Sequence, residues 1–379
     1  MPGAPDRERT HDRLAELARS GLDVESFWRE SEALLAPSLD FDWRACWFTL
    51  DPSSLVMTSH FNQDVERLDD EVLDNEYVED DFNKMADLAA GGVTVTTLAR
   101  ATDGELDRSR RHRDLLSAYD LDHELVALLA SGDTVWGAMT LYRGCGRPDF
   151  SDDDLAFVTL VAPTLAAGAR RGLLVEPGDE TDDPGPAAPA VLVVDSTGDV
   201  VSASVSAEHW LGALGGTPDR LPPSVRALAG AAGRPEGEEQ TLRLRTRTGG
   251  WAFVHAVGLS GSSGEVAVVI EPASPERLGP LLMAAHGLST REQEVTQRLL
   301  RGASTKEIAE ELHLSPHTIQ DHLKSIFDKT GVRSRRQLLA RVFFDHYEPR
   351  VRDNETRVLD HRPIRGGPWA HPEHSSAKV

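Results

Sequence analysis

Apolar residues recur at helical spacing in four consecutive segments near the C-terminal end of the chain. In each segment they fall on one helical face: Val295, Leu299 and Leu300; Ile308 and Leu312; Ile319, Leu323, Ile326 and Phe327; and Leu338, Leu339 and Val342. Ser289 and Ser304 each stand three residues before a glutamate, which is capping-box spacing, and Ser315 precedes a proline. The pattern predicts a helix-turn-helix bundle of four helices, the third from Pro316 to Thr330 and the fourth from Ser334.

The third predicted helix has a polar face opposite its apolar stripe. At 100° per residue, the side chains that point away from the bundle are His317, Gln320, Asp321, Lys324 and Ser325, flanked by Thr318, His322 and Lys329. Hydrogen-bonding groups on an exposed helix face, with cations at the helix end, fit the major groove of DNA. An ordinary solvated helix face is the alternative, since most charged runs have no other role.

Charge separates this region from the rest of the chain. The 379 residues carry a formal net charge of -22, yet residues 288–347 contain ten Lys and Arg against eight Asp and Glu. Between positions 324 and 341 the bias is stronger, with six basic residues against Asp328 alone. Phosphate contacts need cations, so Arg333 and Arg335 in this run are candidates for them. The acidity of the remaining residues would keep them off DNA by repulsion.

The sequence of these helices resembles the LuxR-type helix-turn-helix domain of bacterial transcription regulators over about 60 residues. A T-R-E-x-E-V opening, K-E-I-A, S-P-x-T-[VI], H-L-K and G-V-R-S-R occur in that order. The resemblance implies base contacts by Gln320, Asp321 and Lys324, to which the outward face adds His317, and phosphate contacts by Thr318, His322 and Lys329. Many members have Lys where this chain has Gln320, so the chain departs from the family at a common base contact.

Partners follow from the size of such a domain. One small helical domain buries too little surface for tight specific binding, so domains of this kind pair on two half-sites about one helical turn apart. We therefore expect double-stranded DNA and a second copy of the chain as partners, with RNA polymerase as a further candidate. The helices at 334–344 and 152–171 are candidate pairing surfaces. Region 4 of sigma factors has a similar helix pair, but the upstream chain shows no helical core-binding segment of that kind.

Residues 22–174 combine an opening helix, several strand-like segments and a closing helix capped by Ser151. The strand-like segments are 45–51, 55–61, 124–131 and 134–143. This order resembles a GAF domain of the kind found upstream of LuxR-type domains, which implies that it senses a small molecule or a protein. Five aromatic residues could line a cofactor pocket here or could be plain core: Trp43, Trp47, Phe61, Trp136 and Tyr142.

Residues 190–272 begin with a strand, a glycine turn, a second strand and a helix, and end with three strand-like segments joined by glycine-rich turns. They resemble a PAS domain. A phosphoacceptor receiver is the alternative, because "VLVVD" could be its first strand, but that fold needs alternating strands and helices.

These assignments predict a multidomain α+β chain with two α/β sensor modules before an all-α four-helix domain. The expected divisions are an N-terminal segment 1–21, a GAF-like domain 22–174, an acidic proline-rich linker 175–189, a PAS-like domain 190–272, a linker 273–287, the helix-turn-helix domain 288–347 and a disordered tail 348–379.

Catalytic chemistry is not indicated. The sequence contains no P-loop, dinucleotide-binding glycine pattern or nucleophile elbow, so we expect no enzymatic activity and no cofactor. The carboxylates at 152–154 stand at a helix start, where they complement the helix dipole. His361, His371 and His374 lie in the polar tail, and a metal role for them is less expected than disorder. Cys46 is interpreted as core, with a redox switch as the alternative.

The two cysteines lack metal-type spacing, and neither a signal peptide nor an apolar run long enough to span a bilayer is present, so we expect a soluble, cytoplasmic protein. Two functions remain open. One is a dimeric DNA-binding transcription regulator with an N-terminal sensor. The other is a signalling or interaction protein whose GAF-like and PAS-like modules bind protein partners and whose helical domain docks on protein. The signal that is sensed is not indicated.

Overall fold

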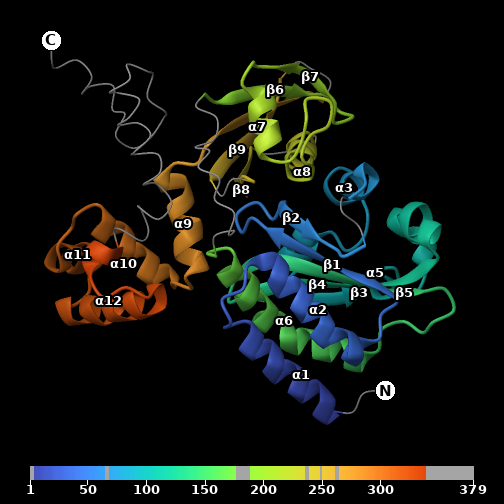
Figure 1. Cartoon of the computed structure of the whole chain (residues 1–379), viewed down its shortest axis with the longest axis horizontal. Helices are drawn as coiled ribbons and strands as arrows, with labels where there is room; N and C mark the ends of the chain where they lie inside the picture. Colours follow the sequence, from blue (N-terminus) through green and yellow to red (C-terminus); the bar gives the residue numbers. More distant parts are fainter. Residues whose placement is uncertain are drawn as a thin grey trace. The chain divides into compact units, whose positions relative to one another are not determined.

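The computed structural model describes residues 4–64, 68–175, 188–234, 239–247, 250–260 and 264–338 (Figure 1). The chain divides into two compact units. The first consists of residues 1–178, 189–247 and 254–270, and the second of residues 179–188, 248–253 and 271–379. Among the described residues, no helix has the length and apolar composition that crossing a membrane requires.

The first sheet is antiparallel, with the strand order β2-β1-β5-β4-β3 over the described residues. Its strands are β1 (Trp43–Leu50), β2 (Met57–Phe61), β3 (Val95–Thr97), β4 (Leu121–Ser131) and β5 (Thr134–Gly144). Ser131 pairs with Thr134, so β4 and β5 are joined by a two-residue turn. Gly132 opens that turn with φ of 62°, a conformation that favours glycine in tight hairpins. The four strands predicted in this region are confirmed as β1, β2, β4 and β5.

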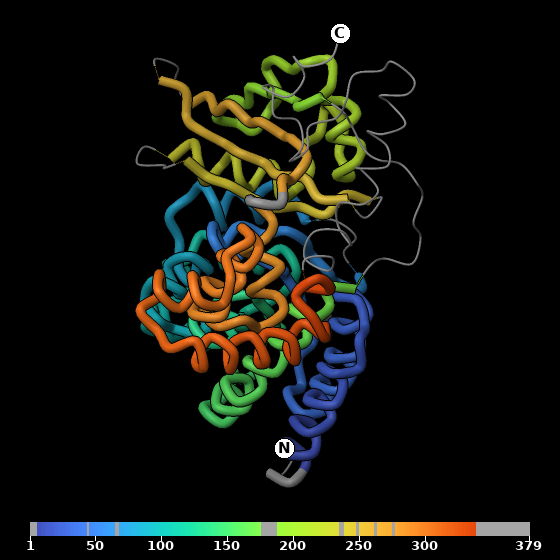
Figure 2. Tube along the Cα trace, turned by 90° about the vertical axis from the view of Figure 1, so that its left-hand side faces the viewer, coloured from blue at the N-terminus to red at the C-terminus, as the bar shows by residue number. Residues whose placement is uncertain are grey.

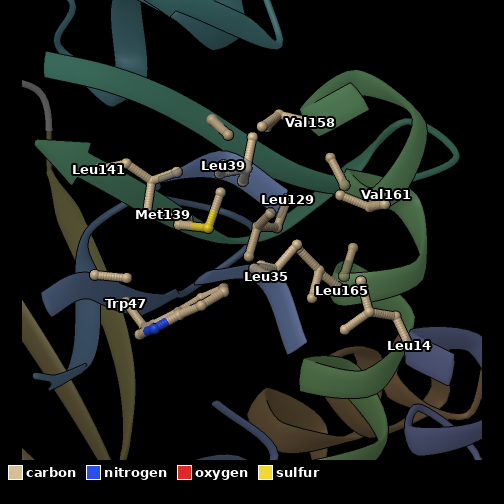
Figure 3. Packing of buried hydrophobic residues seen from close by; sticks show 14 of the residues in the cluster. Leu14, Leu35, Leu39, Trp47, Leu129, Met139, Leu141, Val158, Val161 and Leu165 are labelled. Atoms are coloured by element: carbon tan, nitrogen blue, oxygen red, sulfur yellow. The ribbon is translucent and has the colours of Figure 1, made fainter. Parts of the chain in front are cut away.

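Helices α2 (Val24–Leu39) and α6 (Asp152–Gly172) cover one face of this sheet, and α1 (Ala4–Leu17) packs against those two helices (Figures 1 and 3). The apolar stripes of α2 and α6 meet the inward residues of β1, β4 and β5, as Figure 3 shows for Leu35, Leu165 and Met139. Leu14 of α1 is fully buried in the same core. The domain therefore includes residues that the expected boundary at 22 assigned to a separate segment, and that boundary is too late.

The start of α6 is stabilised as the run of carboxylates predicted. Ser151 and Asp154 form a reciprocal capping box. The Asp154 carboxylate also pairs with Arg7 of α1 and lies 3.3 Å from the guanidinium of Arg143 on β5. This buried ion pair ties the helix start to the sheet, so Asp154 has a structural role.

The segment between β2 and β4 forms short helices: α3 (Asp70–Tyr77), α4 (Met85–Ala90), α5 (Leu98–Ala101), η1 (Leu106–Arg108), η2 (Arg111–Leu115) and η3 (Leu116–Tyr119). Side chains alternate across a strand, so Glu124 and Tyr142 point away from the face that carries Leu125 and Leu141 into the core beneath α6. Tyr142 packs instead with the apolar side chains of this segment.

A second sheet has the order β7-β6-β10-β9-β8 over the described residues. It contains β6 (Ala190–Val194), β7 (Val200–Ala203), β8 (Gln240–Arg245), β9 (Trp251–Gly258) and β10 (Val266–Pro272), with α7 (Ala207–Ala213) and α8 (Pro223–Ala232) between β7 and β8. The five predicted strands are confirmed. The receiver alternative is wrong, because β6 pairs antiparallel with both β7 and β10. The PAS-like assignment stays a prediction.

Ion pairs join the two modules of the first unit. The Arg243 guanidinium on β8 lies 2.9 Å from both carboxylate oxygens of Asp51, whose side chain has no exposed surface, at the end of β1. Arg226 of α8 donates to both oxygens of Asp74 on α3, at 3.0 Å each. Two buried or half-buried guanidiniums therefore connect elements about 150 to 190 residues apart in the chain.

The second unit holds α9 (Pro275–Ala285), α10 (Thr290–Leu300), α11 (Thr305–Glu311) and α12 (Pro316–Thr330). The expected linker 273–287 is wrong over most of its length, because it forms α9 and its Met283 joins the core of the following helices. A further helix starts at 335, and its Leu338 is fully buried; the rest of the predicted fourth helix lies outside the described residues. So do residues 176–187 of the expected linker and the whole 348–379 tail with its histidines.

Candidate nucleic-acid interface

Capping residues define where α10, α11 and α12 begin and where α12 ends. Ser289 with Glu292 and Ser304 with Glu307 form the predicted capping boxes, and the Ser315 hydroxyl accepts from the amide of Thr318. Gly331 ends α12 with φ of 69°, a conformation in which glycine carries no steric cost. These caps satisfy backbone groups that helix ends would otherwise leave unpaired.

One apolar core holds the helices together. Its buried members are Met283, Leu288, Val295, Leu299, Ile308, Ala309, Leu312, Ile319, Ile326, Val332 and Leu338. From α12 it takes Ile319 and Ile326, with Leu323 and Phe327 half-buried beside them. Figures 1 and 2 show α12 along one edge of this unit, with α10 and α11 on one side of it. The opposite side of α12 is therefore free of α10 and α11.

The four residues predicted to read bases all lie on that outer side. His317, Gln320, Asp321 and Lys324 are exposed in the described structure. His317 Nδ1 lies 3.1 Å from Asp321 Oδ2, one helical turn away, with both side chains more than two-thirds exposed. Asp321 and Lys324 line a shallow hollow along α12, together with Ser325, Asp328 and Lys329. The surface thus offers both donors and acceptors, which base edges require.

The residues predicted to contact phosphate flank this face, and they differ in exposure and in hydrogen bonding. Thr318 and His322 are half-buried, and the Thr318 hydroxyl lies 2.9 Å from that of Ser315. Arg333 is exposed just after α12. Arg335 is half-buried, and its Nη2 donates to the carbonyl of Leu299 at 3.0 Å. This hydrogen bond holds the Arg335 side chain against the end of α10.

Lys329 makes an interaction that sequence reasoning missed. Its Nζ donates to Glu292 Oε2 at 2.7 Å, and Ser325 Oγ donates to Glu292 Oε1 at 2.7 Å. The Glu292 side chain is 6% exposed. Burial would raise the pKa of Glu292, but the hydrogen bonds from Lys329, Ser325 and Ser289 lower it further than burial raises it, so the carboxylate stays charged.

The outward placement expected for Ser325 is wrong, because its hydroxyl faces Glu292 and the residue is half-buried. The sequence indicated only one role for Glu292, that of a capping-box residue. Its second role could not be read from spacing, since Ser325 and Lys329 lie 33 and 37 residues away.

The aromatic residues considered as a pocket in the first domain divide between separate clusters. Trp47 is fully buried and stacks on Trp28 with ring centroids 4.7 Å apart, and Phe61 packs against the same core. Trp43 and Tyr142 belong to the cluster on the other face of the sheet. The five residues considered as a pocket therefore do not line one surface. Burial raises the pKa of the Cys46 thiol to about 11, which disfavours the reactive thiolate.

A buried charged cluster on that other face was also missed. Arg111 of η2 donates to Glu124 on β4, to Glu76 on α3 and to the side-chain oxygen of Asn75. Burial raises the pKa of Glu76, partly offset by the charge of Arg111. Arg111 lies 13 to 36 residues from these partners in the sequence, so no local pattern could have joined them.

Two family profiles match the chain. The profile of bacterial regulatory proteins of the luxR family covers residues 286–342, and that of the GAF domain covers residues 12–168. The first includes α10, α11, α12 and all nine predicted DNA-contacting residues. The second begins within α1, in agreement with the burial of Leu14 in the domain core.

Curated relatives match this chain over short stretches of 54 to 92 residues. A probable HTH-type transcriptional regulator, GfsR of Streptomyces halstedii, is 46% identical over 14% of this chain and 22% of its own length. The transcriptional regulatory protein UhpA of Escherichia coli is 36% identical over 24% of this chain and 43% of its own length. The spore germination protein GerE of Bacillus subtilis is 38% identical over 14% of this chain and 74% of its own length.

The chain thus spans less than half of the length of the first two relatives. Among solved structures, the phycoerythrobilin-bound GAF domain of a cyanobacterial phytochrome is 16% identical, over 44% of this chain and 96% of that one. Its TM-score is 0.33, which is too low to support a conclusion.

Proposed function

This chain belongs to the LuxR family of bacterial regulatory proteins, with a GAF domain before its helix-turn-helix, and from that membership we propose that it reads a specific DNA sequence with α12. The GAF domain would control this reading in response to a small molecule or a protein. DNA binding and transcription regulation follow from the family. We propose in addition which residues contact the DNA, that two copies bind together, and that the GAF domain receives the signal.

The observation that carries the proposal is the two-sided character of α12. Ile319 and Ile326 are fully buried in the bundle core, whereas Gln320, Asp321 and Lys324 are exposed on the outer side. Gln pairs well with adenine, Lys donates to guanine O6 or N7, and Asp accepts from cytosine N4. His317 at the start of the helix extends the same face. This set of donors and acceptors suits base reading.

Phosphate contacts would set the position of α12 on the duplex. Thr318, His322, Arg333 and Arg335 flank the outer face. Such contacts carry little sequence information, and they make affinity depend on salt because each neutralised phosphate releases counterions.

We further propose that the chain binds as a homodimer on two half-sites one helical turn apart, since one small helical domain provides few base contacts. The second sheet, in which β6 pairs antiparallel with β7 and β10, supports a PAS-like module as an additional sensing or docking domain. RNA polymerase is the proposed downstream partner. The proposed site of action is the cytoplasm, without enzymatic chemistry or a bound cofactor.

The test is a binding-site selection with the full chain on random duplex DNA, for the wild type and for Gln320→Ala, Lys324→Ala and Arg19→Ala. Arg19 is exposed at the end of α1, so its substitution is the charge control. We expect each α12 variant to lose preference at one base position, by roughly 1–3 kcal/mol. Arg19→Ala should select the wild-type sequence. A wild type that selects nothing would favour a protein-docking role for α12.

A further inference from the structure

The carboxylate of Glu292 joins the first helix of the bundle to the proposed reading helix. Glu292 stands in the first turn of α10 and uses both of its oxygens. Oε1 accepts from the Ser325 hydroxyl, and Oε2 accepts from the Lys329 ammonium and from the amide of Ser289, each at 2.7 Å. With a side chain only 6% exposed, this group is a fixed part of the interior.

The two α12 residues that hold Glu292 are one turn apart. At 100° per residue, they lie within about 40° of each other around the helix axis. Ile319 and Ile326, which enter the core, lie about 100° to one side of Ser325. Lys324 lies about 100° to the other side. The Glu292 contacts therefore stand between the buried stripe and the base-facing arc.

This position matters for the rotation of α12. An apolar core resists large rotations of a helix, which would expose Ile319 and Ile326, but it fixes small rotations less sharply because hydrophobic contact has no direction. Hydrogen bonds to a buried charge do have direction and are short and strong. A turn of α12 by even one residue position would carry Ser325 and Lys329 away from Glu292 and leave that carboxylate charged without its cation, which is strongly unfavourable in a buried site.

We propose that Glu292 is a positioning residue for DNA recognition: it fixes the rotation of α12 through Ser325 and Lys329, and Lys329 acts mainly through Glu292 rather than as an independent phosphate contact. This inference rests on the proposed function of α12. It changes the role that the sequence gave to Lys329, whose ammonium donates to Glu292 although its side chain is 39% exposed. It also adds Glu292 and Ser325 to the residues on which base preference depends.

Glu307 provides a matched control. It occupies the equivalent third position of the capping box at the start of α11, and its Oε2 accepts from the amide of Ser304 at 2.7 Å. Its side chain is exposed, whereas that of Glu292 is buried. Gln serves in a capping box as Glu does, so Glu292→Gln and Glu307→Gln both keep the cap. Only Glu292→Gln removes a charge that binds α12.

The experiment is a binding-site selection followed by salt titration of affinity, on the full chain carrying Glu292→Gln, Ser325→Ala, Lys329→Ala, Glu292→Gln with Lys329→Ala, or Glu307→Gln. We expect the first three to reduce the ratio of specific to nonspecific affinity by roughly tenfold, across several base positions at once. For each variant, the slope of log affinity against log salt concentration should differ from the wild-type slope by less than about half a unit, because no phosphate contact is lost. The double variant should lose no more than the larger single loss, because the two groups act as one pair. Glu307→Gln should match the wild type.

Other outcomes separate the proposals. If Lys329→Ala lowers the salt slope by about one unit and leaves the selected sequence unchanged, Lys329 is a phosphate contact and the inference is wrong. If Glu292→Gln selects the wild-type sequence with the wild-type ratio, the positioning role is also wrong. If the wild type selects no sequence, the proposed function fails and this inference with it. Hydrogen exchange of α10 and α11 amides checks that each variant is folded, and Ser325→Ala is the mildest change should Lys329→Ala unfold.

Discussion

The guanidinium of Arg111 lies 3.2 Å from both carboxylate oxygens of Glu124, whose side chain has no exposed surface in the interior of the GAF domain. Glu76 accepts from the same guanidinium at 3.2 Å. Burial alone would lower the pKa of Arg111, but the two carboxylates raise it above its ordinary value. Removal of Arg111 would therefore leave two buried carboxylates without their cation.

We expect Arg111→Met to destabilise the domain by about 3–5 kcal/mol, the usual cost of breaking a buried ion pair from one side. The measurement is denaturant unfolding of the full chain followed by tryptophan fluorescence. Arg110→Met is the control, because Arg110 is 54% exposed and its ion pairs lie at the surface. It should cost less than about 1 kcal/mol. Equal effects of the two substitutions would contradict the structural role of the cluster.

Gly168 on α6 is expected to tolerate no side chain. A Cβ at this position would lie 2.0 Å from the ring of Phe27, which is fully buried against α6. We expect Gly168→Ala to destabilise the protein by roughly 1–3 kcal/mol through overpacking. Gly212→Ala on α7 has free space around the new methyl group and should be neutral or stabilising by up to about 1 kcal/mol. Thermal unfolding of both variants tests the difference, and a Gly168→Ala protein as stable as the wild type would refute it.

The ion pair between Arg243 and Asp51 should couple the two modules of the first unit. Arg243→Ala leaves the buried Asp51 carboxylate without its guanidinium, although the amide and hydroxyl of Ser53 still donate to it. We expect faster hydrogen exchange in both β2 and α8, because each module loses its partner surface. The exposed Arg247 is the control. If exchange rises in β8 alone, the pair does not couple the modules.

Acid should weaken the attachment of α12 through Glu292. The folded-state pKa of this group lies below its ordinary value of 4.5, so its contribution to stability is present above pH 4.5 and is lost as pH falls through the folded pKa. We expect α12 amides to exchange faster in Glu292→Gln than in the wild type at pH 7, with the difference shrinking below about pH 4.5. Comparing the two proteins at each pH cancels the intrinsic exchange rate. A difference that grows on acidification would contradict the lowered pKa.

Signals within one or two helical turns could be read from the sequence. Ser289, Ser304 and Ser315 fixed helix starts because capping depends on neighbouring residues. The inner and outer sides of α12 followed from apolar spacing, apart from Ser325. α9 was missed because Gly279 and Pro280 interrupt it, and both lower helix propensity. Tertiary packing, seen in the burial of Met283, decides that segment instead.

Contacts between distant segments could not be read in this way. α1 was assigned to a separate segment, yet burial of side chains such as Leu14 and the ion pair between Arg7 and Asp154 join it to the domain. The Arg111 cluster and the Glu292 contacts depend on side chains brought together by the fold. In the sequence Glu292 was recognised only as a capping-box residue and Lys329 only as a phosphate contact. A pattern of spacing contains no information about such partners.

The most direct test of the central claim is the affinity of the full chain for its selected duplex and for a shuffled duplex of equal length, measured across a range of salt concentrations. We predict that the selected site binds at least about a thousandfold more tightly at physiological salt, and that both affinities fall steeply as salt rises. Gln320→Ala and Lys324→Ala should reduce the ratio without abolishing binding to the shuffled duplex. Equal affinity for the two duplexes, or binding to neither at low salt, would contradict DNA reading by α12.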